Sequence, residues 1–248
     1  MAFRSILCVI HSGAANNEAV AQAELLAGPQ TDLSFLAVAG SEHESGEEAE
    51  ALAAELGVRE SVRIDRGANP SRVLLDASAG ADLLVVAGPD DARPGDVVLG
   101  STASSAVHAA ELPVLVARRP PDGRTFPGDI LVSTDGSPDS RRGVELGGRV
   151  AVAHDSRIAL VHVSEGRSQP HRAVVEDAVA LRKEVGVEPA MIEEFGNPAD
   201  QVAEVARRER VSLLVVGSRG LGGARRLGSV GERLAHEARC SVLVARPS

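Results

Sequence analysis

Aromatic residues are nearly absent from this 248-residue chain, which has no tryptophan, no tyrosine and only four phenylalanines. Stacking platforms for single-stranded nucleic acid, cages for quaternary ammonium groups and interfacial membrane anchors are all built from aromatic rings. The composition therefore argues against all three kinds of site. The remaining profile, with 44% hydrophobic and 25% charged residues, is that of a folded chain with enough apolar material for two domains.

Lysine is also scarce, since Lys183 is the only lysine among 26 basic residues. No Gly-Lys-Ser or Gly-Lys-Thr is present, which excludes a P-loop. The formal net charge of −9, without a long basic run, disfavours binding to nucleic acid. An anion site in this chain must therefore be local, built from backbone amides and a few arginines.

The sequence also lacks metal-binding cysteine pairs and long apolar segments. Cys8 and Cys240 lie far apart, in or beside apolar runs, and are expected to be buried as small hydrophobic residues. No apolar stretch reaches about 18 residues, and the chain runs directly into a strand pattern without a signal peptide. These features predict a cytoplasmic protein with no membrane partner.

An internal repeat organises the chain. Leu99-Gly100-Ser101 recurs as Leu227-Gly228-Ser229, and the same offset of 128 residues carries Val114–Arg118 onto Val242–Arg246. Prolines and glycines are concentrated between the two copies, where they prevent a continuous helix or strand. The sequence predicts a first domain at residues 1–119, a linker at 120–128 and a second domain at 129–248.

Short apolar runs alternate with helical patterns in each copy. Apolar runs without polar alternation are typical of parallel strands that are covered on both faces. The sequence therefore predicts two tandem doubly wound α/β domains. The expected strands are residues 6–10, 33–38, 61–65, 83–86 and 114–117 in the first copy, and 130–134, 158–163, 189–194, 213–216 and 242–245 in the second.

A glycine-rich segment follows the fourth strand of the second copy, at residues 217–229. Glycine lets a backbone approach a ligand closely, and Gly228-Ser229 would present free amides at the start of a helix over residues 230–238. Arginines add donors suited to oxyanions: Arg219, Arg225 and Arg226. The segment predicts a phosphate site. A solvated surface loop is the alternative, because short glycine motifs often occur without a ligand.

A carboxylate is predicted at the same edge of the sheet, because Thr134-Asp135-Gly136-Ser137 ends the first strand of the second copy. If strands one and four flank the point where the strand order reverses, Asp135 and the glycine-rich segment face one crevice. An acid for ribose or base and amides for phosphate then describe one nucleotide. The alternative role for Asp135 is a helix N-cap, which Ser137 or Asp139 could equally provide.

On these residues both copies resemble the universal stress protein family, over nearly the whole chain. The family's ATP-binding signature is Gly, two residues, Gly, nine residues, then Gly followed by Ser or Thr. The resemblance implies a Rossmann-like five-stranded parallel sheet of order 3-2-1-4-5 in each domain, with the two domains packed as a pseudo-dimer. It also implies ATP or ADP, with Mg²⁺ left open, between the first and fourth strands.

The same resemblance implies roles for individual residues of the second domain. Asp135 would contact adenosine, and Val163 at the end of the second strand would meet adenine. The phosphates would be held by the residues of the signature: Gly217, Gly220, Gly228 and Ser229. Arg219 and Val230 complete the predicted nucleotide-binding set.

Both copies depart from the signature. In the second copy, seven residues and not nine separate Gly220 from Gly228. In the first copy the spacing is kept, but Ala87 and Asp90 replace the two leading glycines and His11 stands in place of the acid. Asp90 would also repel phosphates. We therefore expect a nucleotide site in the second domain and a degenerate one in the first.

No catalytic constellation is present in the sequence. Ser229 does not lie in a Gly-x-Ser-x-Gly motif, because Leu227 stands two places before it. His108 and His236 are equivalent in the two copies and are expected to pack and not to ligate a metal. The sequence predicts no enzyme, with slow ATP hydrolysis left open.

The preferred function is a stress-response protein that binds ATP or ADP in its second domain and acts as a nucleotide-dependent sensor or regulator. One alternative is an interaction scaffold of the same fold that binds no nucleotide. A weaker alternative is an enzyme of the wider adenine-nucleotide α-hydrolase-like group. The two domains are expected to pair within one chain, and a further homodimer is left open.

Overall fold

Short apolar runs form one parallel sheet in each of the two units into which the chain divides, Phe3–Arg118 and Arg119–Ser248, with Met1–Ala2 belonging to the second. This architecture is that of a computed structural model. It describes residues 2–11, 16–38, 54, 62–65, 70–89, 99, 101–164, 172–219 and 228–246. Each sheet has five strands, which confirms the predicted fold class.

In the first unit the strands follow the order β3-β2-β1-β4-β5, and every neighbouring pair is parallel. The first strand therefore lies in the middle, and the chain adds strands first on one side and then on the other. The elements are β1 (Ser5–His11), α1 (Asn16–Leu26), β2 (Asp32–Val38), β3 (Val62–Asp65), α3 (Pro70–Ala77), β4 (Leu83–Ala87), α4 (Ser101–Ala109) and β5 (Val114–Ala117).

The second unit repeats this order as β8-β7-β6-β9-β10. In the region predicted to link the domains, Pro121–Gly123 forms one 3₁₀ turn, η1, and Phe126 is buried. The other elements are β6 (Asp129–Ser133), α5 (Pro138–His154), β7 (Arg157–Ser164), α6 (Arg172–Val185), β8 (Ala190–Phe195), α7 (Pro198–Arg208), β9 (Leu213–Gly217), α8 (Ser229–Glu237) and β10 (Ser241–Ala245).

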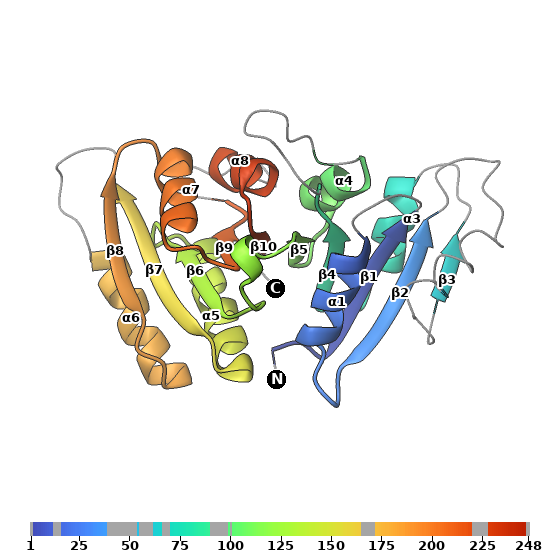
Figure 1. Ribbon diagram of the computed structural model, residues 1–248, viewed down its shortest axis with the longest axis horizontal. Helices are drawn as coiled ribbons and strands as arrows, with labels where there is room; N and C mark the ends of the chain where they lie inside the picture. The colour runs from blue at the N-terminus through green and yellow to red at the C-terminus, as the bar shows by residue number, and fades with distance from the viewer. Residues whose placement is uncertain are drawn as a thin grey trace. The chain divides into compact units, whose positions relative to one another are not determined.

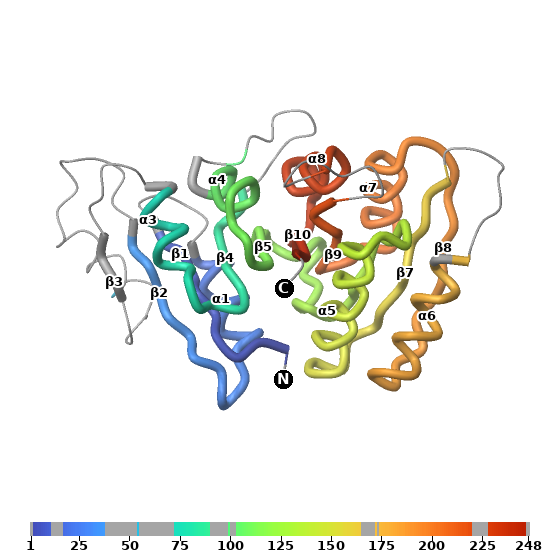
Figure 2. The backbone as a smooth tube through the Cα atoms, turned by 180° about the vertical axis from the view of Figure 1, so that it is seen from behind, coloured from blue at the N-terminus to red at the C-terminus, as the bar shows by residue number. Residues whose placement is uncertain are grey.

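Helices cover both faces of the sheet in the second unit. The opposite views of Figures 1 and 2 show α5 and α6 on one face and α7 and α8 on the other. The central strands β9 and β10 are accordingly buried along their length, from Leu213 to Val216 and from Ser241 to Ala245. Double coverage explains why these strands carry no polar alternation. Cys8 and Cys240 are buried, as expected from their apolar surroundings.

Helix α5 lies unusually close to its neighbours because glycines replace larger residues on its inner side. A Cβ atom at Gly147 would lie 2.8 Å from the Cγ2 of Val132 in β6, and one at Gly148 would overlap the Cδ1 of Leu181 in α6. Glycine inside a helix costs about 1 kcal/mol relative to alanine. The close approach of α5 to the sheet is what these glycines permit.

The strand order reverses between β6 and β9. The chain passes from β6 outward to β7 and β8, and then crosses to β9 and β10 on the other side. Because β6 and β9 are parallel neighbours, with Val132 beside Val215, their carboxyl ends emerge side by side. Ligands of doubly wound sheets bind at this kind of point.

Candidate functional site

Two loops meet where β6 and β9 end. One is the turn from β6 into α5, which contains Asp135 and Ser137, and the other begins with Gly217, Ser218 and Arg219. The Ser137 hydroxyl donates a hydrogen bond to the Arg219 carbonyl oxygen at 3.3 Å, which joins the two loops directly. The structure thus brings the acid and the start of the glycine-rich segment to one edge of the sheet.

Ser137, and not Asp135, caps helix α5. The Ser137 hydroxyl accepts a hydrogen bond from the Ser140 backbone N–H at 3.2 Å. Asp135 instead accepts the Ser137 N–H at 3.0 Å through its Oδ1 atom, which closes a tight turn. The capping alternative for Asp135 is therefore wrong, and its carboxylate stands at the edge of the sheet before the helix begins.

Gly217 ends β9 against the first turn of α5. A Cβ atom at this position would lie 2.8 Å from the Ser140 backbone nitrogen and 2.9 Å from the Asp139 carbonyl carbon. Both neighbours are backbone atoms of a helix, which cannot move independently. The absence of a side chain at Gly217 is therefore needed for packing, whatever ligand the loop binds.

Asp139 is a buried acid that holds the start of the glycine-rich segment. Its Oδ2 accepts hydrogen bonds from the Ser218 hydroxyl at 2.6 Å and from Arg219 Nε at 2.9 Å, and its Oδ1 accepts Arg219 Nη2 at 3.2 Å. Burial would raise the pKa of Asp139, but the hydrogen bonds from Arg219 and Ser218 and the charge of Arg219 outweigh it and lower that pKa. The result is a bidentate ion pair beside the site.

The N-terminus of α8 completes this edge. The Gly228 N–H donates to the Ser218 carbonyl at 2.6 Å, so the two ends of the glycine-rich segment are pinned together. Among the described residues no side chain caps α8, whereas Asn197 caps α7 with hydrogen bonds to two amides. Ser229 is exposed and Val230 half-buried. The first-turn amides of α8 are thus open to an anion.

Val163 lies near the end of β7, beside β6, and is half-buried. Its neighbour His162 donates from Nδ1 to the Thr134 carbonyl at 2.9 Å and so fastens the end of β7 to the residue that follows β6. The aliphatic Val163 side chain therefore stands at the same edge of the sheet as Asp135.

A second buried acid, Asp177 of α6, contacts Thr134, the residue that follows β6 at the same edge of the sheet. It accepts a short hydrogen bond from the Thr134 hydroxyl, which also lies 3.2 Å from the Ser140 hydroxyl. Burial raises the pKa of Asp177, although the Thr134 bond and the charge of Arg141 act in the opposite direction. The sequence carried a signal for this residue, because Asp177 falls in the apolar phase of α6 with Val174 and Leu181, where a charge is unexpected.

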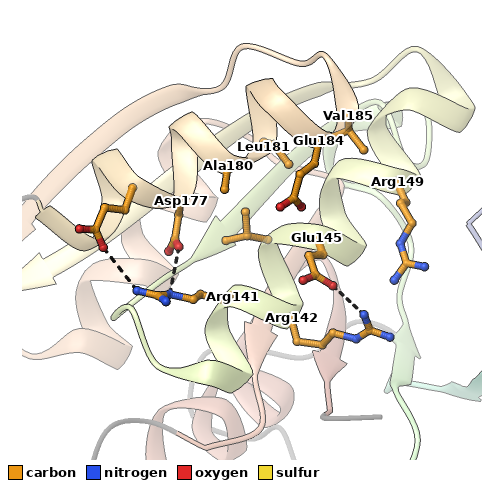
Figure 3. Close-up of a pocket in the computed structure, with 11 residues that line it drawn as sticks. Arg141, Arg142, Glu145, Arg149, Asp177, Ala180, Leu181, Glu184 and Val185 are labelled. Atoms are coloured by element: carbon orange, nitrogen blue, oxygen red, sulfur yellow. Dashed lines mark hydrogen bonds and ion pairs between the residues drawn. The ribbon is translucent and has the colours of Figure 1, made fainter.

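A groove of about 570 Å³ separates α5 from α6 (Figure 3). Arg141 reaches across one end of it, where the guanidinium lies 3.5 Å from both Glu176 and Asp177. The lining also includes the apolar side chains of Val144 and Leu181. None of the predicted nucleotide-binding residues lines this groove, so it is separate from the edge at β6 and β9.

Part of the predicted set falls outside the described residues. In the second unit this applies to Gly220, Arg225 and Arg226, and in the first unit to Asp90 and Gly100. Within the described ranges no cluster of three or more acidic, histidine or cysteine side chains could hold a metal ion. The same part of the chain has no helix with the length and apolar character needed to cross a membrane.

Family comparison matches both units. The model of the universal stress protein family matches residues 5–118 and again residues 128–246. A universal stress protein of Mycolicibacterium smegmatis is 32% identical over 198 residues, which cover 71% of this chain and 66% of that protein. One from Mycobacterium tuberculosis is 34% identical over 200 residues, with 71% and 65% coverage. The chain thus matches slightly less than two thirds of these relatives' length.

Solved structures agree on the fold. A universal stress protein from Archaeoglobus fulgidus superimposes with a TM-score of 0.75, at 16% identity and 99% coverage of both chains. A structure described as a putative universal stress protein from Pseudomonas aeruginosa gives 0.73 at 20% identity, covering 99% of this chain and 94% of that chain. At these identities the likeness shows the fold alone.

Proposed function

Because the chain belongs to the universal stress protein family, we propose that its second unit binds ATP or ADP at the edge of the sheet where β6 and β9 end. The bound nucleotide would be the signal through which the protein senses or regulates a stress response. The proposal assigns the site to Arg119–Ser248 and none to the first unit.

The observation that carries the proposal is the uncapped N-terminus of α8 at the same sheet edge as Asp135. First-turn amides and the positive end of the helix dipole favour a phosphate. A carboxylate one strand away can accept hydrogen bonds from ribose hydroxyls or the adenine amino group. Val163 supplies an aliphatic surface for the base, which suits a chain with no tryptophan or tyrosine.

Arg219 takes two parts in this proposal. Its Nε and Nη2 atoms are engaged by Asp139, so its first part is to position the start of the glycine-rich segment. A guanidinium has five N–H donors, and those on Nη1 can still reach a phosphate. The side chain is 39% exposed, which leaves it accessible to a ligand.

An absorbance scan of the purified protein is the first test. Without tryptophan and tyrosine the chain absorbs very little near 280 nm, so a co-purified adenine nucleotide would dominate the spectrum at 260 nm. Calorimetric titration with ATP and with ADP, each with and without Mg²⁺, then measures affinity and stoichiometry. We expect one nucleotide per chain. No binding under any condition would refute the proposal, and two per chain would refute the assignment to one unit.

Matched variants locate the site. Asp135→Ala is expected to weaken nucleotide binding by about tenfold or more, which is the usual effect of losing a hydrogen bond to a charged group. His11→Ala changes the equivalent position of the first copy and should leave the affinity unchanged. If Asp135→Ala binds as tightly as the wild type, the sheet edge at β6 and β9 is not the site, and the scaffold alternative gains support.

A further inference from the structure

Exposed apolar side chains are concentrated at one end of the second unit. Among the described residues, six large apolar side chains are strongly exposed, and four of them come from α6 and β8. These four are Val175 (44% exposed), Val179 (59%), Met191 (54%) and Phe195 (58%), called here the edge patch. Isolated exposed hydrophobic residues are ordinary, but a group of them marks an interaction surface.

Helical geometry places Val175 and Val179 on the free flank of α6. Val174 and Leu181 are buried, and Ala180 faces α5 across the groove of Figure 3. At about 100° per residue, Val175 and Val179 lie on the flank of α6 that points away from α5. Since α5 packs on β6 and β9 and α6 on β7, this flank points toward the β8 end of the sheet.

Strand alternation places Met191 and Phe195 on the same face of the sheet as α6. Met191 is the neighbour of Leu160 in β7. Leu160 shares a face with Ile158, whose Cδ1 would lie 3.7 Å from a Cβ on Gly147 of α5. The alternate residue Glu194 points the other way and pairs with Arg208 of α7 at 3.0 Å. Met191 and Phe195 therefore belong to the face that α5 and α6 cover.

The outer edge of β8 is also open. In the described part of the chain β8 has a sheet neighbour only on its β7 side, and both views show β8 and α6 together at the outer end of the unit (Figures 1 and 2). The outward N–H and C=O groups of an edge strand are a template for one more strand. Backbone groups and apolar surface are thus presented together.

We propose that β8 and the edge patch dock an extended segment of a partner protein, which adds as a further strand beside β8. At every second residue the segment would present to the edge patch an apolar, then a basic, then an apolar side chain, which lie opposite Met191, Glu193 and Phe195. Glu193 lies between those two apolar residues on the same face, and the whole chain carries a net charge of −9. Strand addition takes its affinity from backbone hydrogen bonds and its specificity from alternate side chains.

A second copy of the chain fits this surface less well. Stable protein interfaces bury about 800 Å² per partner, more than four partly exposed side chains supply. Full overlap of two antiparallel β8 strands would also bring Glu193 and Glu194 of both copies together at the centre, and like charges across a strand pair are destabilising. A basic extended segment avoids that repulsion and gains the backbone hydrogen bonds.

A tryptophan-containing peptide tests the proposal. The probe, called here the alternating peptide, is the seven-residue peptide Thr-Val-Thr-Arg-Thr-Val-Trp, whose valines and arginine all point to one face of a strand. Because the 248-residue chain has no tryptophan, fluorescence anisotropy at 0.15 M salt reports only the peptide. A peptide of the same composition, Thr-Val-Arg-Thr-Thr-Val-Trp, turns the arginine to the other face and controls for charge, and one with proline as its third residue controls for backbone pairing.

Three variants localise the binding. Phe195→Ser and Glu193→Gln are each expected to lower the affinity for the alternating peptide by about fivefold to tenfold. Val152→Ser removes an equally exposed apolar side chain of α5 outside the edge patch and should leave the affinity unchanged. All three positions are at the surface, and circular dichroism checks that each variant stays folded.

Several results would overturn the proposal. They are no binding of the alternating peptide, equal binding of the peptide with the turned arginine or of the proline peptide, or equal losses from Phe195→Ser and Val152→Ser. Light scattering gives a further one: a dimer that Phe195→Ser converts to monomer would show that a second copy occupies the surface. A nucleotide is not required for any of these measurements, so their outcome is independent of the function proposed above.

Discussion

The two copies of the repeat share one sheet topology and one backbone arrangement at the end of their fourth strand. In the first copy the Gly88 N–H donates to the Ala117 carbonyl at 2.7 Å, and in the second the Ser218 N–H donates to the Ala245 carbonyl at 2.9 Å. The side chains differ sharply. Ala87-Gly88-Pro89 stands in the first copy at the positions of Gly217-Ser218-Arg219 in the second.

The partner positions differ as well. By the offset that aligns the first strands of the two copies, Ala15 corresponds to Asp139 and Ile10 to Thr134. Both members of the Asp139–Arg219 ion pair are therefore missing from the first copy, together with the hydroxyl that Asp177 binds. A buried charge without its partner is costly, so such a cluster is kept or lost as a set. The sheet does not depend on it, and fold and site are separable.

The largest loss of stability is expected when Gly217, at the end of β9, is replaced by alanine, the residue that the first copy has at the equivalent position. Gly217→Ala places a methyl group against backbone atoms of Asp139 and Ser140, which cannot yield separately. We expect the free energy of unfolding to fall by about 3 kcal/mol, near the upper end of overpacking costs. Urea denaturation followed by far-ultraviolet circular dichroism measures it.

The control for this variant is a glycine-to-alanine substitution at Gly143, which lies in α5 one helical turn after Asp139 and Ser140. A Cβ at Gly143 would meet only ordinary contacts, the nearest at 3.5 Å to Val215 Cγ1. Gly143→Ala should therefore be neutral or stabilising by up to about 1 kcal/mol, because alanine favours a helix. Equal destabilisation by both variants would contradict the close approach of β9 to α5.

A smaller loss is expected when the acid of the ion pair is replaced by its counterpart from the first copy. Asp139→Ala leaves the buried Ser218 hydroxyl without its acceptor and Arg219 without its carboxylate. We expect a loss of about 2 kcal/mol at neutral pH, below the cost of breaking a fully buried pair because Arg219 is partly exposed. Asp76→Ala, at the exposed ion pair with Arg72, should change stability by less than about 0.5 kcal/mol.

The pH dependence of that loss has a definite sign. The folded-state pKa of Asp139 is lowered, so its contribution to stability is present above the ordinary aspartate pKa and disappears as the pH falls through the folded-state value. The difference between wild type and Asp139→Ala should shrink on acidification from neutral pH. A difference that stays constant down to the acid unfolding range would mean that Asp139 is not held as a paired carboxylate.

The smallest effect concerns Asp177, whose pKa is raised mainly by burial. An acid whose pKa is raised by folding stabilises the protein while it is protonated. Its contribution to stability is therefore present below the ordinary aspartate pKa and declines as the pH rises through the folded-state pKa. As the pH rises through this range, the free energy of unfolding should therefore fall less for Asp177→Asn than for the wild type. The difference between the two falls should be less than about 1 kcal/mol. Parallel stability curves for the two proteins would contradict the raised pKa.

Much of the fold follows from local pattern. The ends of the predicted strands agree with the observed ones to within one residue, because a strand buried on both faces leaves an uninterrupted apolar run. The location of the candidate site also follows from topology, since Asp135 and Gly217 end strands that flank the reversal of strand order. Their roles in nucleotide binding stay predictions.

The connections between distant side chains could not be predicted in the same way. The sequence predicts Arg219 as a phosphate ligand because it is an arginine in a glycine-rich segment. In the structure its main partner is Asp139, 80 residues earlier in the chain. The sequence predicts Gly217 as a glycine of a ligand-binding loop. In the structure its close packing against α5 requires a glycine there whether or not a ligand binds. In each case the deciding contact comes from another element.

The scarcity of aromatic residues, the repeat and the apolar runs belong to the sequence by itself; the repeat and the apolar runs determined the duplication and the fold class, and the scarcity of aromatics argues against stacking sites. These properties depend on composition, on the apolar pattern within single elements and on the similarity of two stretches of the same chain. Only the tertiary structure decided which polar groups are buried together and which apolar ones stay exposed on α6 and β8. Such pairings depend on helix position and strand order, because a charge is stabilised or destabilised by whatever the fold places beside it.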